Sequence, residues 1–582
     1  MELDNAENRP SRNETTRRGF LKSGALTAGV LFAQPLLKAT AVEPAFSKRR
    51  TLLKKGLVVD GTGKKGAVGH VLIQGDRIEA VSEGPIDVEC DTLDCTGKVI
   101  APGFIDVHSH MDWVLAIEGR ADLKAPFIAQ GCTTFVAGNC GHGVAGFRPN
   151  SPHRKHINPG LFGEFDLAWD TMEEYFDHLR RIGLSHNLVN LAGHGTTRLS
   201  MRWDDPSPLS ADEMKELLRL LEKALDQGAW GVSFGLQYSP GIFATPDELK
   251  QVARLVAKKG KVLTVHARAY SSLSPGYKVD LFGGTPHNVL ALEEMIGLAR
   301  ETGVRLQYSH LMFAGTASHR TYRQCLDVID QARDEGVDVM IDTYPYHCGT
   351  SVINVVLPAW FRENLPENFH DEDALKRLEG ELSMMSPLVG FGYDDIQITN
   401  ANDPELAQYN GLFVSQIAEK LGVSPFEAAM LLSEKGGRRG AWVLNHNYSN
   451  MEIIDALIQY PACLFMSDAV PAKGVKNPAA YGAFALTLQY ARDRKLIPLE
   501  DAVHKMTGAS AERLHIKDRG FLRKGLAADV TVFDWNAVQD NNSVADTDNA
   551  PAGIHAVFMN GKRVFKDGKV DERANAGMVL SA

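Results

Sequence analysis

Short apolar runs recur through the middle of the chain, and stretches with helical periodicity separate most of them. A run of four to six apolar residues suits a buried strand, whereas apolar residues spaced three and four apart suit an amphipathic helix. Residues 211–227 show the second pattern, with Met214, Leu217, Leu218 and Leu221 on one face. This alternation is typical of repeated strand–helix units and a parallel sheet. The eight predicted strands end in residues 105–108, 134–137, 188–191, 231–234, 263–266, 306–310, 339–342 and 464–467.

Eight such units predict an α/β fold, a (β/α)8 TIM-like barrel over residues 101–519. The last unit is delayed by residues 348–460, a segment much longer than an ordinary connection between a strand and its helix. We therefore expect residues 348–460 to be an insertion that walls or covers the mouth of the active site.

Strand patterns of a different kind stand at both ends of the chain. They cover residues 57–59, 69–73 and 77–81 near the start, and 528–533, 556–559 and 563–565 near the end. Asn560-Gly561 is a typical signal for a tight hairpin. The two ends are therefore predicted to build one small β-sandwich domain from residues 48–100 and 520–575, with the barrel inserted between them.

The first 41 residues have the pattern of an export signal. The twin-arginine motif TRRGFLK at residues 16–22 precedes an apolar stretch, residues 23–37, and the small-x-small sequence Ala39-Thr40-Ala41. The apolar stretch is shorter than the roughly 18–20 residues that a spanning helix needs. We predict a twin-arginine signal peptide over residues 1–41, transport of the precursor by the twin-arginine machinery, and a periplasmic or secreted mature protein with no membrane segment.

Composition narrows the class of protein. A chain of 582 residues with 44% apolar residues can bury a full core and exceeds the usual size of one domain. The formal net charge of −10, with acidic residues scattered, offers no basic face for nucleic acid. Seven dispersed cysteines do not make a dense disulfide framework. Because seven is odd, at least one thiol is free or bound to metal.

Residues of the types that bind metals stand at the carboxyl ends of the predicted strands. They are His108, His110, Cys140, His266, His310 and Asp468. Barrel enzymes keep their active sites at this end, so the six side chains should converge. Taken singly, such a histidine usually packs, such a cysteine is a small buried apolar residue, and such an aspartate caps a helix. Their joint placement favours a metal site, in which Asp468 can bind the metal and accept a proton from metal-bound water.

Several motifs carry a resemblance to known proteins. PGFIDVHSH at residues 102–110, Ser467-Asp468, and residues 519–529 resemble the amidohydrolase superfamily. Further motifs are similar to those of the N-acyl-D-amino-acid deacylase (D-aminoacylase) family: GNCG at 138–141, GHG at 193–195, LQYSPG at 236–241, DTYPY at 342–346 and YGAF at 481–484. The resemblance covers nearly all of the chain after the signal. Many superfamily members bridge two metals with a carboxylated lysine at the fourth strand, but residues 230–238 hold no lysine, and Cys140 is the available bridging ligand.

The resemblance implies a zinc-dependent hydrolase of linear C–N amide bonds. Cys140, His266 and His310 would form the tighter Zn²⁺ site, and His108, His110 and Asp468 would surround a second, more weakly filled one. A metal-bound hydroxide would attack the carbonyl, with Asp468 as general base and then as general acid. Substrate would contact Tyr238, Tyr344, and Thr350, which stands where a serine is common. His194 would donate to the oxyanion, with a purely structural histidine as the alternative.

Two positions depart from the family pattern. Met312 stands where the family commonly has a lysine, and Ala479 follows Pro478 where the family commonly has an arginine. In the family these cations hold the carboxylate of the substrate, a contact worth ~1.5–3 kcal/mol. Lys473 or Lys476 could substitute. We expect the reaction type to be kept and substrate recognition to differ at these positions.

Other functions remain open from the sequence. The main alternative is hydrolysis of a cyclic amide, as in a hydantoinase or dihydroorotase, or of another substrate without a carboxylate. An alternative of another class is a non-catalytic, exported binding protein, against which the presence of Asp468 argues. The expected partner is a small-molecule amide, and an oligomer is compatible with the sequence.

Overall fold

The computed structural model describes residues 49–154, 157, 167–274, 276–277, 284–469 and 476–581. All of these residues belong to one compact unit, Ser47–Ala582. The predicted signal over residues 1–41 lies outside the described residues. In the part of the chain that is described, no helix is both long and apolar enough to cross a membrane.

A strand is present at each of the eight positions predicted for the middle of the chain. Six strands form one parallel sheet in the order β17-β13-β12-β11-β10-β9, and three form a second parallel sheet in the order β6-β7-β8. Their bounds are β6 Phe104–Asp106, β7 Cys132–Ala137, β8 Asn187–Asn190, β9 Ala192–Gly193, β10 Gly231–Gly235, β11 Val262–His266, β12 Arg305–Tyr308, β13 Val339–Thr343 and β17 Cys463–Phe465. The expectation of an α/β fold with parallel strands is confirmed.

The two parallel sheets approach each other at two places. Leu191 alone separates β8 from β9, so these two short strands run on from one sheet into the other. After β17, the backbone N–H of Asp468 donates to the carbonyl of His108, 3.0 Å away, beyond the end of β6. The carboxyl ends of the first and last strands therefore lie side by side.

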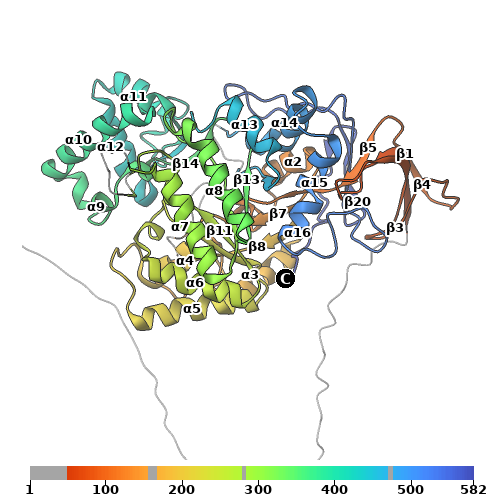
Figure 1. Cartoon of the computed structure of the whole chain (residues 1–582), viewed down its shortest axis with the longest axis horizontal. Coiled ribbons are helices and arrows are strands. Elements are labelled where there is room, and N and C mark those ends of the chain that lie inside the picture. The colour runs from red at the N-terminus through yellow and green to blue at the C-terminus, as the bar shows by residue number, and fades with distance from the viewer. Residues whose placement is uncertain are drawn as a thin grey trace, which may run out of the picture. The chain divides into compact units, whose positions relative to one another are not determined.

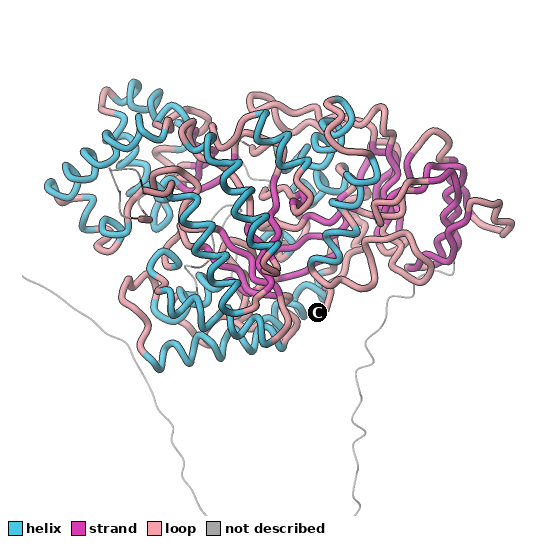
Figure 2. The backbone as a smooth tube through the Cα atoms, in the orientation of Figure 1, coloured by secondary structure: helices cyan, strands magenta, loops and turns pink. Residues whose placement is uncertain are grey.

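Amphipathic helices pack against these strands (Figures 1 and 2). The helix predicted over 211–227 is α5, Ala211–Asp226, which begins with a capping box between Ser210 and Glu213. Met214, Leu217 and Leu221 are buried as expected, and Leu218 is half-buried. The other main helices here are α2 Ala121–Ala129, α3 Met172–Ile182, α4 His194–Arg202, α6 Pro246–Lys258, α7 His287–Thr302, α8 Tyr322–Asp334, α13 Met451–Gln459, α14 Ala479–Asp493 and α15 Leu499–Met506.

Both ends of the described chain contribute to one nine-stranded sheet. Eight strands follow the order β21-β20-β19-β18-β5-β1-β2-β3, and β4 pairs with β1. The bounds are β1 Arg50–Val58, β2 Ala67–Gln74, β3 Arg77–Ser82, β4 Asp91–Asp94, β5 Val99–Pro102, β18 Val530–Phe533, β19 Ile554–Met559, β20 Lys562–Lys566 and β21 Lys569–Val570. The two ends meet where β5 pairs antiparallel with β18, with Ile100 opposite Val532. β4, β5 and β21 were not predicted from the sequence.

The segment that delays the last strand has a core of its own. Its strands β14 Gly349–Val352, β16 Trp442–Asn445 and β15 Ile396–Asn400 form an antiparallel sheet, and α9 Ala359–Arg362, α10 Glu372–Val389, α11 Val414–Leu421 and α12 Pro425–Lys435 lie together beside it (Figure 1). The buried residues of this core run from Ile353 to Val443. Helix α13 packs into the main core instead, so the separate core is shorter than the segment 348–460.

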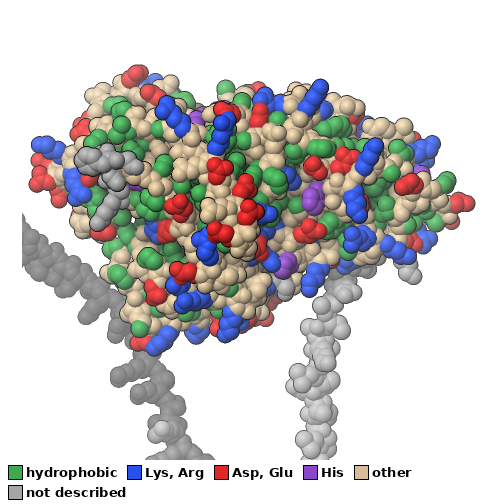
Figure 3. Space-filling model, viewed as in Figure 1, with side chains coloured by type: hydrophobic (Ala, Val, Ile, Leu, Met, Phe, Trp, Pro, Cys, Tyr) green, Lys and Arg blue, Asp and Glu red, His purple; other side chains and the backbone are tan. Residues whose placement is uncertain are grey.

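Charged side chains are spread over the surface. Figure 3 shows acidic and basic residues interspersed on the visible face, without a broad region of one sign. This distribution agrees with the net charge of −10 and the scattered acidic residues of the sequence.

Candidate metal centre

The structure brings together all six residues expected to bind metal. Each lies at or just beyond the carboxyl end of a parallel strand: His108 and His110 after β6, Cys140 after β7, His266 at the end of β11, His310 after β12 and Asp468 after β17. Because parallel strands end at one edge, six residues distant in the sequence reach one place.

Four of the six form the tightest group. The ligand-type atoms of His108, Cys140, His310 and Asp468 all lie within 4.8 Å of one another. Cys140 Sγ is 3.3 Å from His108 Nε2 and 3.4 Å from His310 Nε2. The Oδ1 atom of Asp468 is 3.3 Å from the same His108 nitrogen. Sulfur, two imidazoles and a carboxylate therefore meet at one point.

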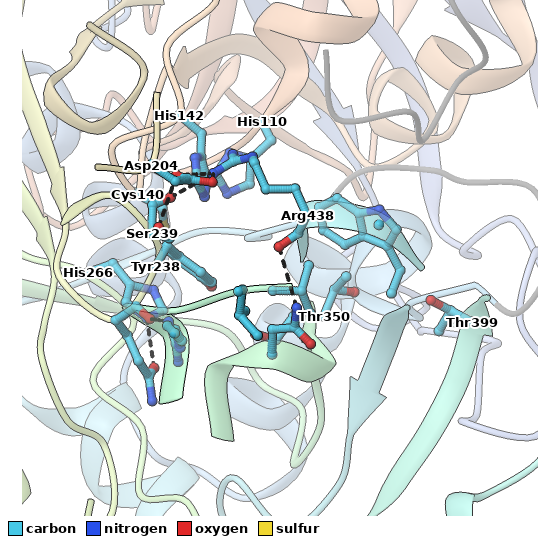
Figure 4. Close-up of a pocket in the computed structure, with 18 of the residues that line it drawn as sticks. His110, Cys140, His142, Asp204, Tyr238, Ser239, His266, Thr350, Thr399 and Arg438 are labelled. Carbon is cyan, nitrogen blue, oxygen red and sulfur yellow. Dashed lines mark hydrogen bonds and ion pairs between the residues drawn. The ribbon is translucent and has the colours of Figure 1, made fainter. Parts of the chain in front are cut away.

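The other two histidines flank this group. His110 Nε2 is 3.5 Å from Asp468 Oδ1, and His266 Nδ1 is 3.1 Å from His310 Nε2. The tight group thus takes members from both of the sites that the resemblance implied. Figure 4 shows His110, Cys140 and His266 around one cavity.

Three members of the tight group adopt a backbone conformation that side chains disfavour. The φ angles are 53° at Cys140, 35° at His310 and 46° at Asp468. Each such residue costs of order 1–3 kcal/mol, and this strain is characteristic of functional sites. Gly235 allows the Cys140 backbone to approach closely, because a Cβ at position 235 would lie 2.0 Å from the carbonyl oxygen of Cys140.

Two buried aspartates support the candidate ligands, and the sequence analysis missed both. Asp106 accepts from the Ser467 hydroxyl at 2.6 Å and from the backbone N–H of Ser467 at 3.0 Å. Asp342 accepts from the backbone N–H of His310 at 2.6 Å and lies 3.8 Å from His108 Nδ1. Burial raises the pKa of Asp106 to about 7. Both residues stand inside motifs that were recognised, PGFIDVHSH and DTYPY, and that position was the available signal.

The charges of the group stabilise one another. Burial alone would raise the pKa of Asp468, but the charges of His108 and His310 and hydrogen bonds from His108 and His110 hold it below its ordinary value. The same two histidines outweigh burial at Cys140 and lower its pKa, which favours the thiolate. A thiolate and a carboxylate are the forms that bind a metal cation.

The donor set fits Zn²⁺. Sulfur, imidazole nitrogen and carboxylate oxygen are the donors this ion takes in proteins. The Nε2 atoms of His108 and His310 both face the Cys140 sulfur, so they are the nitrogens placed to bind the ion. His108, Cys140, His310 and Asp468 would hold a first ion, with His110 and His266 at either side.

A cavity of about 650 Å³ opens over this group. The residues expected to contact substrate, Tyr238, Tyr344, Thr350 and Met312, all line it, together with Asp468. The Tyr344 hydroxyl lies 3.8 Å from Met312 Sδ. Asn477 Nδ2 donates to the Thr350 hydroxyl at 3.1 Å. Burial raises the pKa values of Tyr238 and Tyr344 well above the ordinary range, so both hydroxyls remain donors at neutral pH.

His194 lies outside the residues that line this cavity. It is the first residue of α4, is fully buried, and places Nε2 2.8 Å from Glu248 Oε1. Arg198 Nε lies 3.3 Å from the same oxygen. Because His194 does not line the cavity, neither of its ring nitrogens is placed to reach an oxyanion there, and the geometry favours the structural alternative.

Two lysines could replace the cations that are missing at Met312 and Ala479. One of them, Lys476, forms an ion pair with Asp548. Lys473 lies outside the described residues. Ala479 is the first residue of α14 and is fully buried.

Comparison with known proteins identifies the class. Residues 91–565 match the profile of the amidohydrolase family, and the chain belongs to that family. It is a hydrolase that acts on carbon–nitrogen bonds other than peptide bonds.

Particular relatives are nearly as long as this chain. It is 31% identical to the N-acyl-D-glutamate deacylase of Alcaligenes xylosoxydans xylosoxydans over 88% of this chain and 93% of that one. It is 29% identical to the D-aminoacylase of the same organism, covering 91% and 97% of the two chains. The crystal structure of N-acyl-D-glutamate deacylase from Bordetella bronchiseptica, complexed with zinc and a phosphonate inhibitor, matches with a TM-score of 0.75 and 28% identity over 92% of this chain and all of that one.

Proposed function

We propose that this protein is a zinc-dependent deacylase that hydrolyses the linear amide bond of N-acyl-D-amino acids. The observation that carries the proposal is the convergence of His108, Cys140, His310 and Asp468 within 4.8 Å at the wall of a substrate-sized cavity. Two relatives of similar length are named for this activity, N-acyl-D-glutamate deacylase and D-aminoacylase, which supports the same substrate class here.

Zn²⁺ supplies Lewis-acid polarisation of the amide carbonyl and acidification of water. The residues of this chain would do the rest. Asp468 lines the cavity and is ionised, so it has a free carboxylate that would take a proton from the attacking water and return it to the leaving amine. Tyr238 and Tyr344 line the same cavity as protonated hydroxyls and would orient the substrate. Asp342 would position His310 through its backbone N–H.

The test combines metal content with hydrolysis on purified protein. Wild type should bind Zn²⁺ and deacylate N-acetyl-D-amino acids. Asp468→Ala should lose at least on the order of 10²-fold in kcat, because the proton-transfer group is gone. Asp534→Ala, directly after β18 and paired with Lys98, is the matched control and should keep full activity. Turnover of cyclic amides with none of N-acyl compounds would contradict the substrate class, and undiminished activity of Asp468→Ala would contradict the mechanism.

We propose that the parallel strands close into a (β/α)8 barrel over residues 101–519, with β8 and β9 as one interrupted strand and with the Ile353–Val443 core inserted. The continuation of β8 into β9 and the bond between Asp468 and His108 support closure. For the nine-stranded sheet, a buried cluster that joins Leu53, Val71 and Ile78 to Val530 and Phe558 supports a sandwich in which the sheet folds over its own core. An experimental structure with eight closed strands would be the expected result.

We propose export through the twin-arginine pathway to the periplasm, on the motif at residues 16–22 and the small residues 39–41. Replacing Arg17 and Arg18 with lysines should retain the full-length protein in the cytoplasm. Fractionation of cells that express the two forms measures this directly, and unchanged export would contradict the proposal.

A further inference from the structure

Two arginines of the insertion reach the loop that follows β10. Arg362, at the end of α9, donates from Nη1 to the carbonyl of Gln237 at 2.8 Å. Arg438, in the short turn after α12, donates from Nη1 to the carbonyl of Ser239 at 3.2 Å. Both arginines line the cavity above the candidate metal centre. Figure 4 shows Arg438 extending toward Asp204 and Ser239.

This loop also touches the metal centre. Gln237 Oε1 lies 3.0 Å from His266 Nε2, and the ring of Tyr238 lies 4.4 Å from that of His266. The two guanidinium groups and the candidate ligand His266 therefore contact the same loop, residues 237–239. A substrate bound at the metal centre would extend along this loop toward the arginines.

The two arginines of this wall differ in their charged partners. Asp204 accepts from Arg438 Nη1 with both carboxylate oxygens, at 2.8 and 3.0 Å, and from the Ser239 hydroxyl at 2.9 Å. The contacts of Arg362 with a polar partner are both to backbone carbonyls, Gln237 O and Leu357 O. Glu363 and Glu434 also line the cavity, and in the described part of the chain neither forms an ion pair with these arginines. Among the described residues, Arg438 therefore has a carboxylate partner, Asp204, and Arg362 has none.

Arg362 also has an unused donor. Its side chain lines the cavity although the residue is only 9% exposed, and its Nη2 has no hydrogen-bond partner among the described residues. Burial lowers its pKa only to about 10, so the group stays charged at neutral pH. A buried cation without a carboxylate partner is destabilising, and an anion bound beside Arg362 in the cavity would lower that cost.

The guanidinium group of Arg438 has one edge that makes no hydrogen bond within the described chain. The hydrogen bonds of Arg438 all use Nη1, so the edge formed by Nε and Nη2 remains for a ligand. That edge has the geometry for two parallel hydrogen bonds to a carboxylate. The Arg438 guanidinium carbon also lies 5.5 Å from the centre of the Trp203 ring, which restricts its position.

We propose that Arg438 and Arg362 form a carboxylate-binding subsite for the substrate of this enzyme. The subsite takes the place of the cations that are absent at Met312 and Ala479, and it makes the insertion a determinant of substrate specificity. This inference rests on the proposed deacylase function.

The test compares an acid with its neutral counterpart. Wild type and Arg438→Met holoenzymes are assayed with an N-acyl-D-amino acid and with the corresponding N-acyl-D-amino acid amide, which differ only in the carboxylate. We expect wild type to prefer the acid, and Arg438→Met to lose on the order of 10- to 100-fold in kcat/KM on the acid while staying within about threefold on the amide. Arg438→Lys should fall between them.

Arg202→Met is the matched control, because Arg202 lines the same cavity but both of its terminal nitrogens are bound by carboxylates, Nη2 by Asp205 and Nη1 by Glu213. It should leave the acid-to-amide ratio unchanged. Equal losses on acid and amide in Arg438→Met would mean that the arginine only holds the loop, and would overturn the subsite alone. No acid preference in wild type would overturn it as well. Hydrolysis of neither compound by zinc-loaded wild type would overturn the deacylase function itself.

Discussion

Replacing Gly235 with alanine should weaken metal binding without removing a ligand. The added Cβ would lie 2.0 Å from the carbonyl oxygen of Cys140 and 2.7 Å from its carbonyl carbon. Since ordinary contacts begin near ~3.4 Å, the Cys140 backbone must shift by more than an ångström. Metal sites hold their ligands to within about ±0.2 Å. We therefore expect zinc affinity to fall at least on the order of 10-fold, because one ligand is displaced, together with ~1–3 kcal/mol of stability.

The assay is a competitive chelator titration of zinc-loaded protein, with thermal unfolding recorded in parallel. Gly297→Ala makes the same chemical change in α7, where nothing lies within 4 Å of the added carbon. It should keep zinc affinity and gain ~0.5–1 kcal/mol of stability, since alanine favours a helix. Wild-type zinc affinity in Gly235→Ala, with the fold intact, would refute the inference that Cys140 binds the metal in this geometry.

Three further outcomes follow from other parts of the structure. Adding Met312→Lys to Arg438→Met should restore part of the preference for the acid over the amide, measured by the ratio of their kcat/KM values, because a cation returns to the cavity. Glu248→Gln should lower the free energy of unfolding, measured by chemical denaturation, by ~1–3 kcal/mol. It should leave kcat/KM of the folded enzyme within about threefold of wild type, because His194, the partner of Glu248, is outside the cavity. A selective loss of kcat would instead indicate that His194 takes part in the mechanism. Burial, aided by the charge of Lys124, lowers the pKa of His186 in the folded protein to about 3. In the unfolded chain this histidine has its ordinary pKa of about 6.5. Between these two pH values His186 is therefore protonated in the unfolded chain and neutral in the folded one. Stability should fall by up to ~1.4 kcal/mol per pH unit from this residue as pH drops toward 3, and His186→Gln should show a smaller fall in urea unfolding between pH 6 and pH 4.

The sequence was sufficient to predict which residues meet, but not how they group. Every candidate ligand stands at the carboxyl end of a strand, and strand ends follow from apolar runs and the residues that break them. The direction of each side chain depends on local backbone angles such as the positive φ of Cys140 and His310. Those angles are set by contacts such as Gly235 against Cys140, which join residues far apart in the chain. The tight group of four therefore differs from the two sets of three that the resemblance implied.

His194 illustrates the same limit. The sequence places it directly after a strand, where catalytic residues of such enzymes stand. Its ring nevertheless faces Glu248 on α6, and that pairing depends on how two helices pack. No local pattern distinguishes a histidine that faces the cavity from one that faces a neighbouring helix.

The insertion shows why substrate recognition was the hardest part to predict. The length of the insertion indicated that it forms a wall of the active site. Arg362 and Arg438, however, lie 76 positions apart, one at the end of the short helix α9 and the other in the turn after α12. No periodicity or motif in the sequence predicts that these two residues lie near each other. They become neighbours only because both donate to the loop 237–239, which belongs to the parallel-strand core. The metal ligands are fixed by strand ends, while these arginines are supplied by a segment with its own core. A change in the insertion can therefore alter which substrate is held without disturbing the groups that cleave it, and the proposed subsite would supply two guanidinium groups in a chain that lacks cations at Met312 and Ala479.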